Sequence, residues 1–178
     1  MKLTTLFLEQ EKILVPRRSK EQRQKNYLIA TQKKVQQYIK DGSKGDLNLR
    51  GTPIKSLPDN LKVGGHLDLA DTSITSLPDN LEVESNLYLY KTPITSLPDN
   101  LKVGGGLNLR NTPITSLPDN LKVGGDLYLS GTRITSLPDN LKVGGDLDLR
   151  KTPISKKYTE QEIRQMVPGV KGEIYIYI

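Results

Sequence analysis

The sequence predicts a repeat solenoid, in which the chain winds into stacked coils whose short strands form a parallel sheet. A twenty-residue unit recurs from about Asp46 to Thr152, with the letters SLPDNLKVGG repeated almost unchanged, and periods of this kind indicate a solenoid or array. Each unit contains a Leu-x-Leu pair, the alternation typical of a half-buried strand. The chain has eight Tyr, one Phe and no Trp, which suits a core of stacked Leu and Ile layers.

Residues 1–45 are expected to form a basic helical cap, because the end of a solenoid would otherwise expose apolar surface. The pattern predicts a helix over 19–40, with Ser19 and Gln22 as a capping box and Gly42 just beyond its end. A second short helix is expected among Leu3, Leu6, Phe7, Ile13 and Leu14. Four apolar residues of the first helix are expected on one face: Leu28, Val35, Tyr38 and Ile39.

Residues 46–157 are expected to form the array. Because every coil returns to the same side, we expect its strands to stack in parallel, about 4.8 Å apart. Pro in LPDN and the Gly-Gly pair bend the chain between faces, and short extended or 3₁₀ segments are expected on the outer face. The six predicted strands are 47–49, 67–69, 87–89, 107–109, 127–129 and 147–149.

The repeat also predicts which side chains face inward. Counted from the Leu of LPDN, Leu recurs at positions one, five, eleven and thirteen, Val at seven, Thr at sixteen and Ile at eighteen. Buried hydroxyls need hydrogen-bond partners, so the threonines are expected to bond to backbone groups of adjacent coils and form a ladder along the axis. These are Thr52, Thr72, Thr92, Thr112, Thr132 and Thr152.

Residues 158–178 are expected to close the array with a helix and a strand. The letters VKGEIYI at 170–176 match VGGDLDL at 143–149 in residue type, which predicts a seventh strand. The insertion YTEQEIRQMV predicts a short helix with Thr159 and Glu162 as its capping box. An uncovered edge at this strand would invite pairing with another chain. Ile174, Ile176 and Ile178 are expected to face inward, and Tyr175 and Tyr177 outward.

The array resembles leucine-rich repeats, specifically the short class of about twenty residues known from secreted bacterial effector proteins. The resemblance rests on units such as LPDNLKVGGDLYLSGTRITS from Leu117, and it covers about 110 of 178 residues. Thr stands in place of the ladder Asn, Ile in place of the following Leu, and Gly in place of an apolar residue before the strand. The alternative is a β-helix of similar coil length. The literal repeats are also similar to arrays in uncharacterised phage and bacterial proteins.

Some effectors of this class carry a ubiquitin-ligase domain with a catalytic cysteine. The chain contains no Cys, which excludes that activity, disulfides and thiolate metal sites. Glu9, Glu11 and Lys12 interrupt the apolar start, so we expect no signal peptide. No apolar run is long enough to span a bilayer, and we expect a cytoplasmic protein that does not bind membranes.

The working surface is predicted on the exposed strand positions, because the inward positions barely change between units whereas these do. The residue before the first strand Leu is Asp46, His66, Asn86, Gly106, Asp126 or Asp146. The residue between the Leu pair is Asn48, Asp68, Tyr88, Asn108, Tyr128 or Asp148. The residue after the pair is Arg50, Ala70, Tyr90, Arg110, Ser130 or Arg150.

Tyr and Arg are favoured anchors of protein interfaces. The sequence therefore predicts a non-enzymatic protein-binding module, and an inhibitor or adaptor that acts on a host protein is the role we expect of it. Ordinary cross-strand packing is the competing interpretation of the tyrosines. The predicted partner-binding residues are Tyr88, Tyr90, Arg110, Tyr128, Arg150, Asp68, Asn108 and Asp148.

Other site types have weaker support. The aspartates lack a recurring metal-ligand spacing, and Arg110 and Arg150 can neutralise them, so we expect no metal, cofactor or catalytic centre. His66, the one histidine, is expected to be an exposed surface residue. The terminal strand or the N-terminal helix could also pair two copies of the chain.

The net charge of +6 comes from residues 1–45, which hold 11 Lys and Arg against 4 Asp and Glu. An alternative function is therefore nucleic-acid binding through the N-terminal cap. Its candidates are Arg17, Arg18, Lys20, Arg23, Lys25, Lys33 and Lys34.

Overall fold

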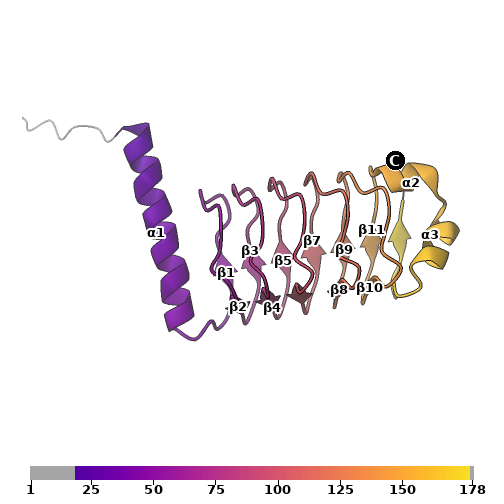
Figure 1. The fold of residues 1–178 in the computed structure, drawn as a ribbon, viewed down its shortest axis with the longest axis horizontal. Helices are drawn as coiled ribbons and strands as arrows, with labels where there is room; N and C mark the ends of the chain where they lie inside the picture. The colour runs from indigo at the N-terminus through magenta and orange to yellow at the C-terminus, as the bar shows by residue number, and fades with distance from the viewer. Residues whose placement is uncertain (1–18, 177–178) are drawn as a thin grey trace, which may run out of the picture.

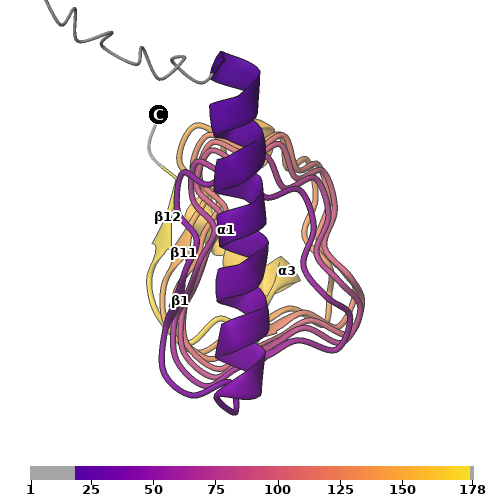
Figure 2. The ribbon, with the colours of Figure 1, turned by 90° about the vertical axis from the view of Figure 1, so that its left-hand side faces the viewer.

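The chain folds as a β-solenoid with a helix across its N-terminal end and a helix–strand closure at its C-terminal end (Figure 1). The computed structural model describes residues 19–176. Each of the five coils from β1 to β10 contributes two short strands, and the coils superpose when they are viewed along the solenoid axis (Figure 2). The predicted repeat solenoid is confirmed.

The first sheet holds seven parallel strands in the order in which they occur along the chain. From β1 to β11, each strand pairs with the residues twenty positions later, as Leu47 does with Leu67, so the period of the sequence sets the register. The strands are β1 (Leu47–Asn48), β3 (Leu67–Asp68), β5 (Leu87–Tyr88), β7 (Leu107–Asn108), β9 (Leu127–Tyr128), β11 (Leu147–Asp148) and β12 (Ile174–Tyr175).

A second parallel sheet of five strands lies on another wall of the coil. The sequence predicted only short extended or 3₁₀ segments outside the Leu-x-Leu strands. Val at position seven is buried and the preceding residue, Lys or Glu, lies outward. One such outward–inward pair in each coil is enough to form a parallel sheet when the coils stack. These strands are β2 (Lys62–Val63), β4 (Glu82–Val83), β6 (Lys102–Val103), β8 (Lys122–Val123) and β10 (Lys142–Val143).

The core is a continuous stack of the predicted Leu, Val and Ile residues, almost all of them buried. The threonines are buried as expected, but the prediction that their hydroxyls bond to adjacent coils is wrong. Each Thr hydroxyl donates to the carbonyl of the Leu three residues earlier in its own coil, as Thr72 does to Leu69 at 2.7 Å. The hydroxyl therefore closes the turn after the strand, and main-chain hydrogen bonds join the coils. Thr52, in the first coil, is only half-buried.

Helix α1 (Lys20–Lys40) crosses the open N-terminal end of the solenoid (Figure 2). Its N-cap is Ser19, whose side chain accepts from the Gln22 amide at 3.1 Å, but the Gln22 side chain donates to Asn26 instead of completing the capping box. Val35 packs into the core cluster. The expected second helix among residues 1–14 lies outside the described residues.

The packing face of α1 differs from the prediction in two residues. Thr31 is buried beside Val35, whereas Ile39 is 37% exposed. Thr31, Val35 and Tyr38 follow the i, i+4, i+7 spacing of one helical stripe, and Ile39 lies one residue further round. The Tyr38 hydroxyl lies 2.8 Å from the Ser43 carbonyl oxygen and accepts from the Gly64 amide at 3.2 Å, which ties the helix end to the first coil.

The C-terminal closure follows the prediction. Helix α3 (Glu160–Met166) has the complete Thr159–Glu162 capping box, and it places the fully buried Ile163 over the last coil. Strand β12 pairs with β11 in parallel, with Leu147 opposite Ile174. A further short helix, α2 (Pro153–Lys157), was not predicted; Thr152 is its N-cap and Pro153 begins it.

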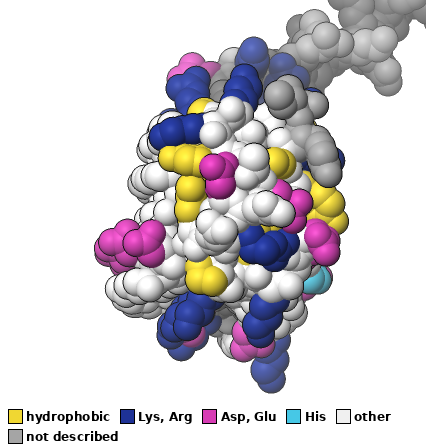
Figure 3. All heavy atoms as spheres, turned by 90° about the vertical axis from the view of Figure 1, so that its right-hand side faces the viewer, with side chains coloured by type: hydrophobic (Ala, Val, Ile, Leu, Met, Phe, Trp, Pro, Cys, Tyr) yellow, Lys and Arg dark blue, Asp and Glu magenta, His cyan; other side chains and the backbone are white. Residues whose placement is uncertain are grey.

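The inward and outward alternation of β12 agrees with its predicted match to the repeat. Ile174 is buried, Ile176 is half-buried and Tyr175 is exposed; Tyr177 and Ile178 lie outside the described residues. Seen from its C-terminal end, the molecule shows basic and acidic side chains mixed with small apolar areas (Figure 3). Within residues 19–176, no helix is both long and apolar enough to cross a membrane.

Candidate functional site

The predicted working surface is the outward side of the seven-stranded sheet, which we call the strand face. Because strand side chains alternate, the buried Leu pair leaves three outward positions in each coil, and stacking of the coils turns these positions into three parallel rows. The first row runs from Asp46 to Asp146, the middle row from Asn48 to Asp148 and the third row from Arg50 to Arg150, each at intervals of twenty residues.

The first row is a ladder of side chains that accept hydrogen bonds from the next coil. Asp46 accepts from the His66 amide at 2.7 Å, His66 Nδ1 from the Asn86 amide at 3.1 Å, and Asn86 from the Gly106 amide at 2.7 Å. The ladder resumes where Asp126 accepts from the Asp146 amide at 2.9 Å. Gly106 has no side chain, so its place in the ladder is empty.

His66 is therefore half-buried and bonded within this ladder, and the expectation of an exposed surface residue was wrong. Its ring also lies 6.2 Å from the Tyr88 ring, centroid to centroid. Sequence spacing gave no sign that a row residue would bond to the main chain of the following coil.

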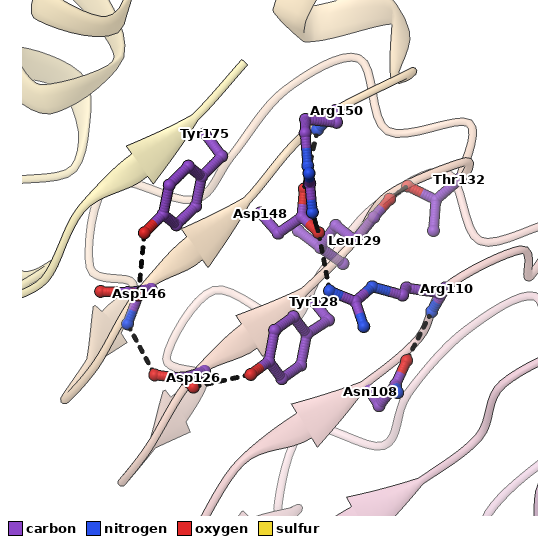
Figure 4. Close-up of polar contacts among 10 residues, drawn as sticks. All are labelled: Asn108, Arg110, Asp126, Tyr128, Leu129, Thr132, Asp146, Asp148, Arg150 and Tyr175. Carbon is purple, nitrogen blue, oxygen red and sulfur yellow. Dashed lines mark hydrogen bonds and ion pairs between the residues drawn. The ribbon is translucent and has the colours of Figure 1, made fainter. Parts of the chain in front are cut away.

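Asp148, in the middle row, is the centre of an ion-pair network (Figure 4). Its side chain is 2% exposed and forms two ion pairs. Arg150 Nε lies 2.9 Å from Asp148 Oδ1, and Arg110 Nη2, from two coils away, lies 2.9 Å from Asp148 Oδ2. Burial raises the pKa of Asp148, but hydrogen bonds from Arg150 and Arg110 outweigh it, and the pKa lies below its ordinary value. The sequence indicated that these arginines could neutralise the aspartates, and both of them converge on this one.

Tyr128 connects the network to the first row. The Arg110 guanidinium lies 4.0 Å from the Tyr128 ring centroid, and the Tyr128 hydroxyl donates to Asp126 at 2.7 Å (Figure 4). The pKa of Asp126 is lowered because the carboxylate accepts from the Asp146 amide and from Tyr128. The pKa of Tyr128 is raised because its proton is held by Asp126 and because the ring is partly buried.

Two hollows lie side by side on the strand face, and each contains a position where the side chain is small. The first, which we call the Ala70 hollow, has a volume of about 470 Å³. It is lined by Arg50, Asp68, Ala70, Tyr88, Tyr90, Asn108 and Arg110. The second, the Gly106 hollow, has a volume of about 380 Å³. It is lined by Asn86, Tyr88, Gly106, Asn108, Arg110, Gly125, Asp126 and Tyr128.

The structure brings most of the predicted partner-binding residues together around these hollows. Tyr88, Asn108 and Arg110 line both. The Asn108 side chain accepts from the Arg110 amide at 3.1 Å, so it also shapes the turn after its strand. Arg150 and Asp148 lie beyond the hollows, in the ion-pair network.

The sequence analysis did not single out Ala70 and Gly106, although they create the hollows. The signal was present in the rows: Ala70 stands among Arg, Tyr and Ser residues, and Gly106 among Asp, His and Asn residues. A search for large anchor residues does not find positions where the side chain is small or absent.

Metal binding has no support among residues 19–176, where no group of three or more His, Asp or Glu side chains is placed to hold an ion. The basic candidates on α1 divide into two sets. Lys20, Arg23, Lys25 and Lys33 are exposed, whereas Lys34 donates to the Asn48 carbonyl at 2.5 Å and so anchors the helix to β1. Arg17 and Arg18 lie outside the described residues.

Comparisons with known proteins supply no identity for this site, since neither the scan against protein-family models nor the search of curated proteins finds a match.

Proposed function

We propose that the chain is a non-enzymatic protein-binding module that holds its partner on the strand face. The observation that carries this proposal is the pair of adjoining hollows, with Tyr88 and the partly exposed Arg110 between them. Aromatic residues and arginine dominate binding energy at protein interfaces when they are packed beside a depression that a partner can fill.

The scaffold suits this role because the face is held in place before binding. Most outward side chains are fixed by the strand register, by the side-chain ladder of the first row and by the Asp148 network. A pre-organised surface of this kind loses little entropy on binding. An inhibitor or adaptor that acts on a host protein in the cytoplasm remains our proposal for the biological role. The resemblance to bacterial and phage leucine-rich repeats supports this role and the repeat class.

The test is capture of partners from a lysate of the native host, followed by mass spectrometry, with the purified chain and two variants. Replacing Tyr88 and Tyr90 together by Ala should reduce recovery of the specific partner at least tenfold, because each ring contributes to a hollow. The matched control replaces the exposed Lys122 and Lys142 on the second sheet by Ala and should leave recovery unchanged. Equal recovery with both variants would rule out the strand face as the binding surface.

Nucleic-acid binding through α1 is the second candidate, supported by the exposed Lys20, Arg23, Lys25 and Lys33. Phosphate contacts release counterions, so such binding falls steeply between 50 and 200 mM salt, by about a thousandfold or more for six contacts. Binding that tolerates 200 mM salt and depends on Tyr88 and Tyr90 supports the protein-binding proposal instead.

A further inference from the structure

On the strand face, one arginine of the chain is held by a tyrosine ring and a carboxylate of the same chain. Tyr128 and Asp148 are direct neighbours in the parallel register. The Arg110 guanidinium lies over the Tyr128 ring and donates to Asp148, while Arg150 approaches the same carboxylate through Nε and Nη2, both at 2.9 Å. A planar guanidinium meets here both an aromatic face and a carboxylate.

The same two residue types are neighbours again at Asp68 and Tyr88, where the tyrosine lies on the following strand, as Tyr175 does beside Asp148. Asp68 makes the same local contact as Asp148: its Oδ1 accepts from the amide two residues on, at 2.9 Å from Ala70, as Asp148 Oδ1 does from Arg150 at 3.2 Å. Arg150, which pairs with Asp148 and lies 5.8 Å from the Tyr175 ring centroid, is replaced at the equivalent position here by Ala70. Among residues 19–176, no lysine or arginine nitrogen lies within ion-pair distance of Asp68.

The Ala70 hollow opens beside this second pair. Its two arginines are each bound to another carboxylate: Arg50 to Asp71 at 2.9 Å, and Arg110 to Asp148. Asp68 is the acidic residue in its lining. The hollow thus combines a carboxylate, two tyrosine rings and the space that a missing arginine side chain leaves.

We propose that the Ala70 hollow binds an arginine side chain of the partner protein, with the guanidinium paired to Asp68 and stacked against Tyr88 or Tyr90. This inference rests on the proposed protein-binding function and names the chemistry of the partner. Arginine fits better than lysine, because its flat fork can meet a carboxylate with two hydrogen bonds while its face lies on a ring.

The proposal can be tested without the partner. N-acetyl-arginine-N-methylamide is titrated into the ¹⁵N-labelled chain at low salt, and amide shifts are followed by NMR. We expect saturable shifts at Asp68, Ala70 and Tyr88, with none at Asp148. The matched lysine probe should bind at least threefold more weakly, and the matched glutamate probe should not bind. Binding of the glutamate probe in preference to the arginine probe would overturn the proposal.

Two variants assign the binding to Asp68. Asp68→Asn keeps an oxygen for the Ala70 amide, so the turn is preserved, but it should weaken arginine binding about tenfold because the charge-assisted contact is lost. Arg50→Ala removes a like charge from the rim of the hollow and should strengthen arginine binding at least twofold. If Arg50→Ala weakened binding of the arginine probe, Arg50 would be contributing to the site instead of repelling the guanidinium, and the proposed pairing would fail.

Ala70→Arg tests the geometry within the chain itself. The new side chain should occupy the hollow, abolish the probe-induced shifts at Tyr88 and raise the melting temperature, and Asp68→Asn in the same chain should remove that gain. A gain that is independent of Asp68 would contradict the proposed pairing. If the arginine probe does not bind while Tyr88 and Tyr90 are still needed for partner capture, this inference fails and the proposed function stands.

Discussion

At the scale of single residues, Asp148 shows how a buried charge is tolerated on a binding face. Its carboxylate is almost fully buried, yet two arginines from different coils and the Arg150 amide satisfy it. A buried charge without partners is strongly destabilising, so removing the acid leaves two guanidinium groups without their shared acceptor. The network therefore joins three coils, from Arg110 past Tyr128 to Arg150.

We expect Asp148→Asn to lower the free energy of unfolding by about 2 kcal/mol at pH 7, less than for a fully buried pair because both arginines are partly exposed. The pKa of Asp148 is depressed in the folded state, so its stabilisation is complete above the unfolded-state pKa of about 3.9 and is lost as pH falls through the folded-state pKa. Urea unfolding at pH 7 and in steps below pH 4 should show the difference between wild type and variant shrinking as acid is added. Asp119→Asn, at an exposed turn, is the control, and a difference independent of pH would contradict the assignment.

The empty place in the first-row ladder leads to a second prediction. Asn86 accepts from the Gly106 amide, but Gly106 offers nothing to the Asp126 amide, which has no acceptor among the described residues. A Cβ built on Gly106 would lie 3.2 Å from the Asp126 carbonyl oxygen, which accepts from the Leu107 amide, so this oxygen must move by a few tenths of an ångström to admit a side chain.

Gly106→Asn should therefore raise the free energy of unfolding by about 1 kcal/mol, through one hydrogen bond and a less flexible unfolded chain. Gly106→Ala makes the same Cβ contact and also restricts the unfolded chain, but it adds no hydrogen bond. The difference between the two variants in chemical denaturation therefore isolates the hydrogen bond. If Ala stabilised the chain as much as Asn does, the ladder would not be the reason.

The sequence predicted on which face each residue lies, but it did not predict all of the hydrogen-bond and ion-pair partners. The period of twenty put Asp126 and Asp146 side by side and set Tyr88, Arg110 and Tyr128 on one face, and the structure has them there. It could not show that Arg110 reaches past Tyr128 to Asp148, because a long side chain chooses among several neighbours by rotamer and not by register. The threonine hydroxyls illustrate the same limit, since the local Leu carbonyl competes with the next coil and is nearer.

At the scale of elements, prediction succeeded where a pattern is literal. The Leu-x-Leu strands and their register follow from residue type and a fixed period. The match of VKGEIYI to the repeat placed β12 despite an insertion that changes the spacing from twenty to twenty-seven, as in the pair Leu147 and Ile174. The capping box at Thr159 located α3 because it specifies a helix start by side-chain chemistry.

The elements that escaped prediction have weak local signals. The second sheet rests on a two-residue alternation of Lys or Glu with Val, which is too short to indicate a strand by periodicity. Stacking of five such pairs makes it a sheet. Helix α2 has five residues and begins at Pro153, in a segment that earlier coils use as extended chain. In the last coil α2 and α3 follow one another before β12, so tertiary context decides the conformation there.

At the scale of the whole molecule, the chain is a one-dimensional stack in which each coil contacts its neighbours, while its two ends are closed by different means. Helix α1 covers the first coil, and α3 covers the last (Figure 1). In such a stack stability is close to a sum over coils and interfaces, and surface features belong to particular coils. The Ala70 hollow draws on residues between Arg50 and Arg110, so coils beyond Arg110 contribute rigidity but no contact to it.

Deletion of one whole repeat tests this modular organisation. Removing residues 117–136 joins Ser116 to Leu137, and the sequence across the junction still reads TSLPDN. We expect a folded protein whose two sheets each lose one strand, with a denaturant m-value lower by roughly a tenth because less surface is buried. Tyr128, which packs against Arg110, is lost with the deleted coil. Every residue that lines the Ala70 hollow is retained, so the arginine probe should bind within twofold of its original affinity.

A deletion one residue shorter is the matched control. Removing 117–135 shifts the following strands by one position, and because side chains alternate with a period of two, the Leu pair of β11 would turn outward and Asp148 inward. That variant should not fold cooperatively, as circular dichroism and thermal unfolding would show. Equal stability of the two deletions would mean that the coil is not a unit of twenty residues, and loss of arginine binding in the longer deletion would mean that the hollow depends on coils it does not touch.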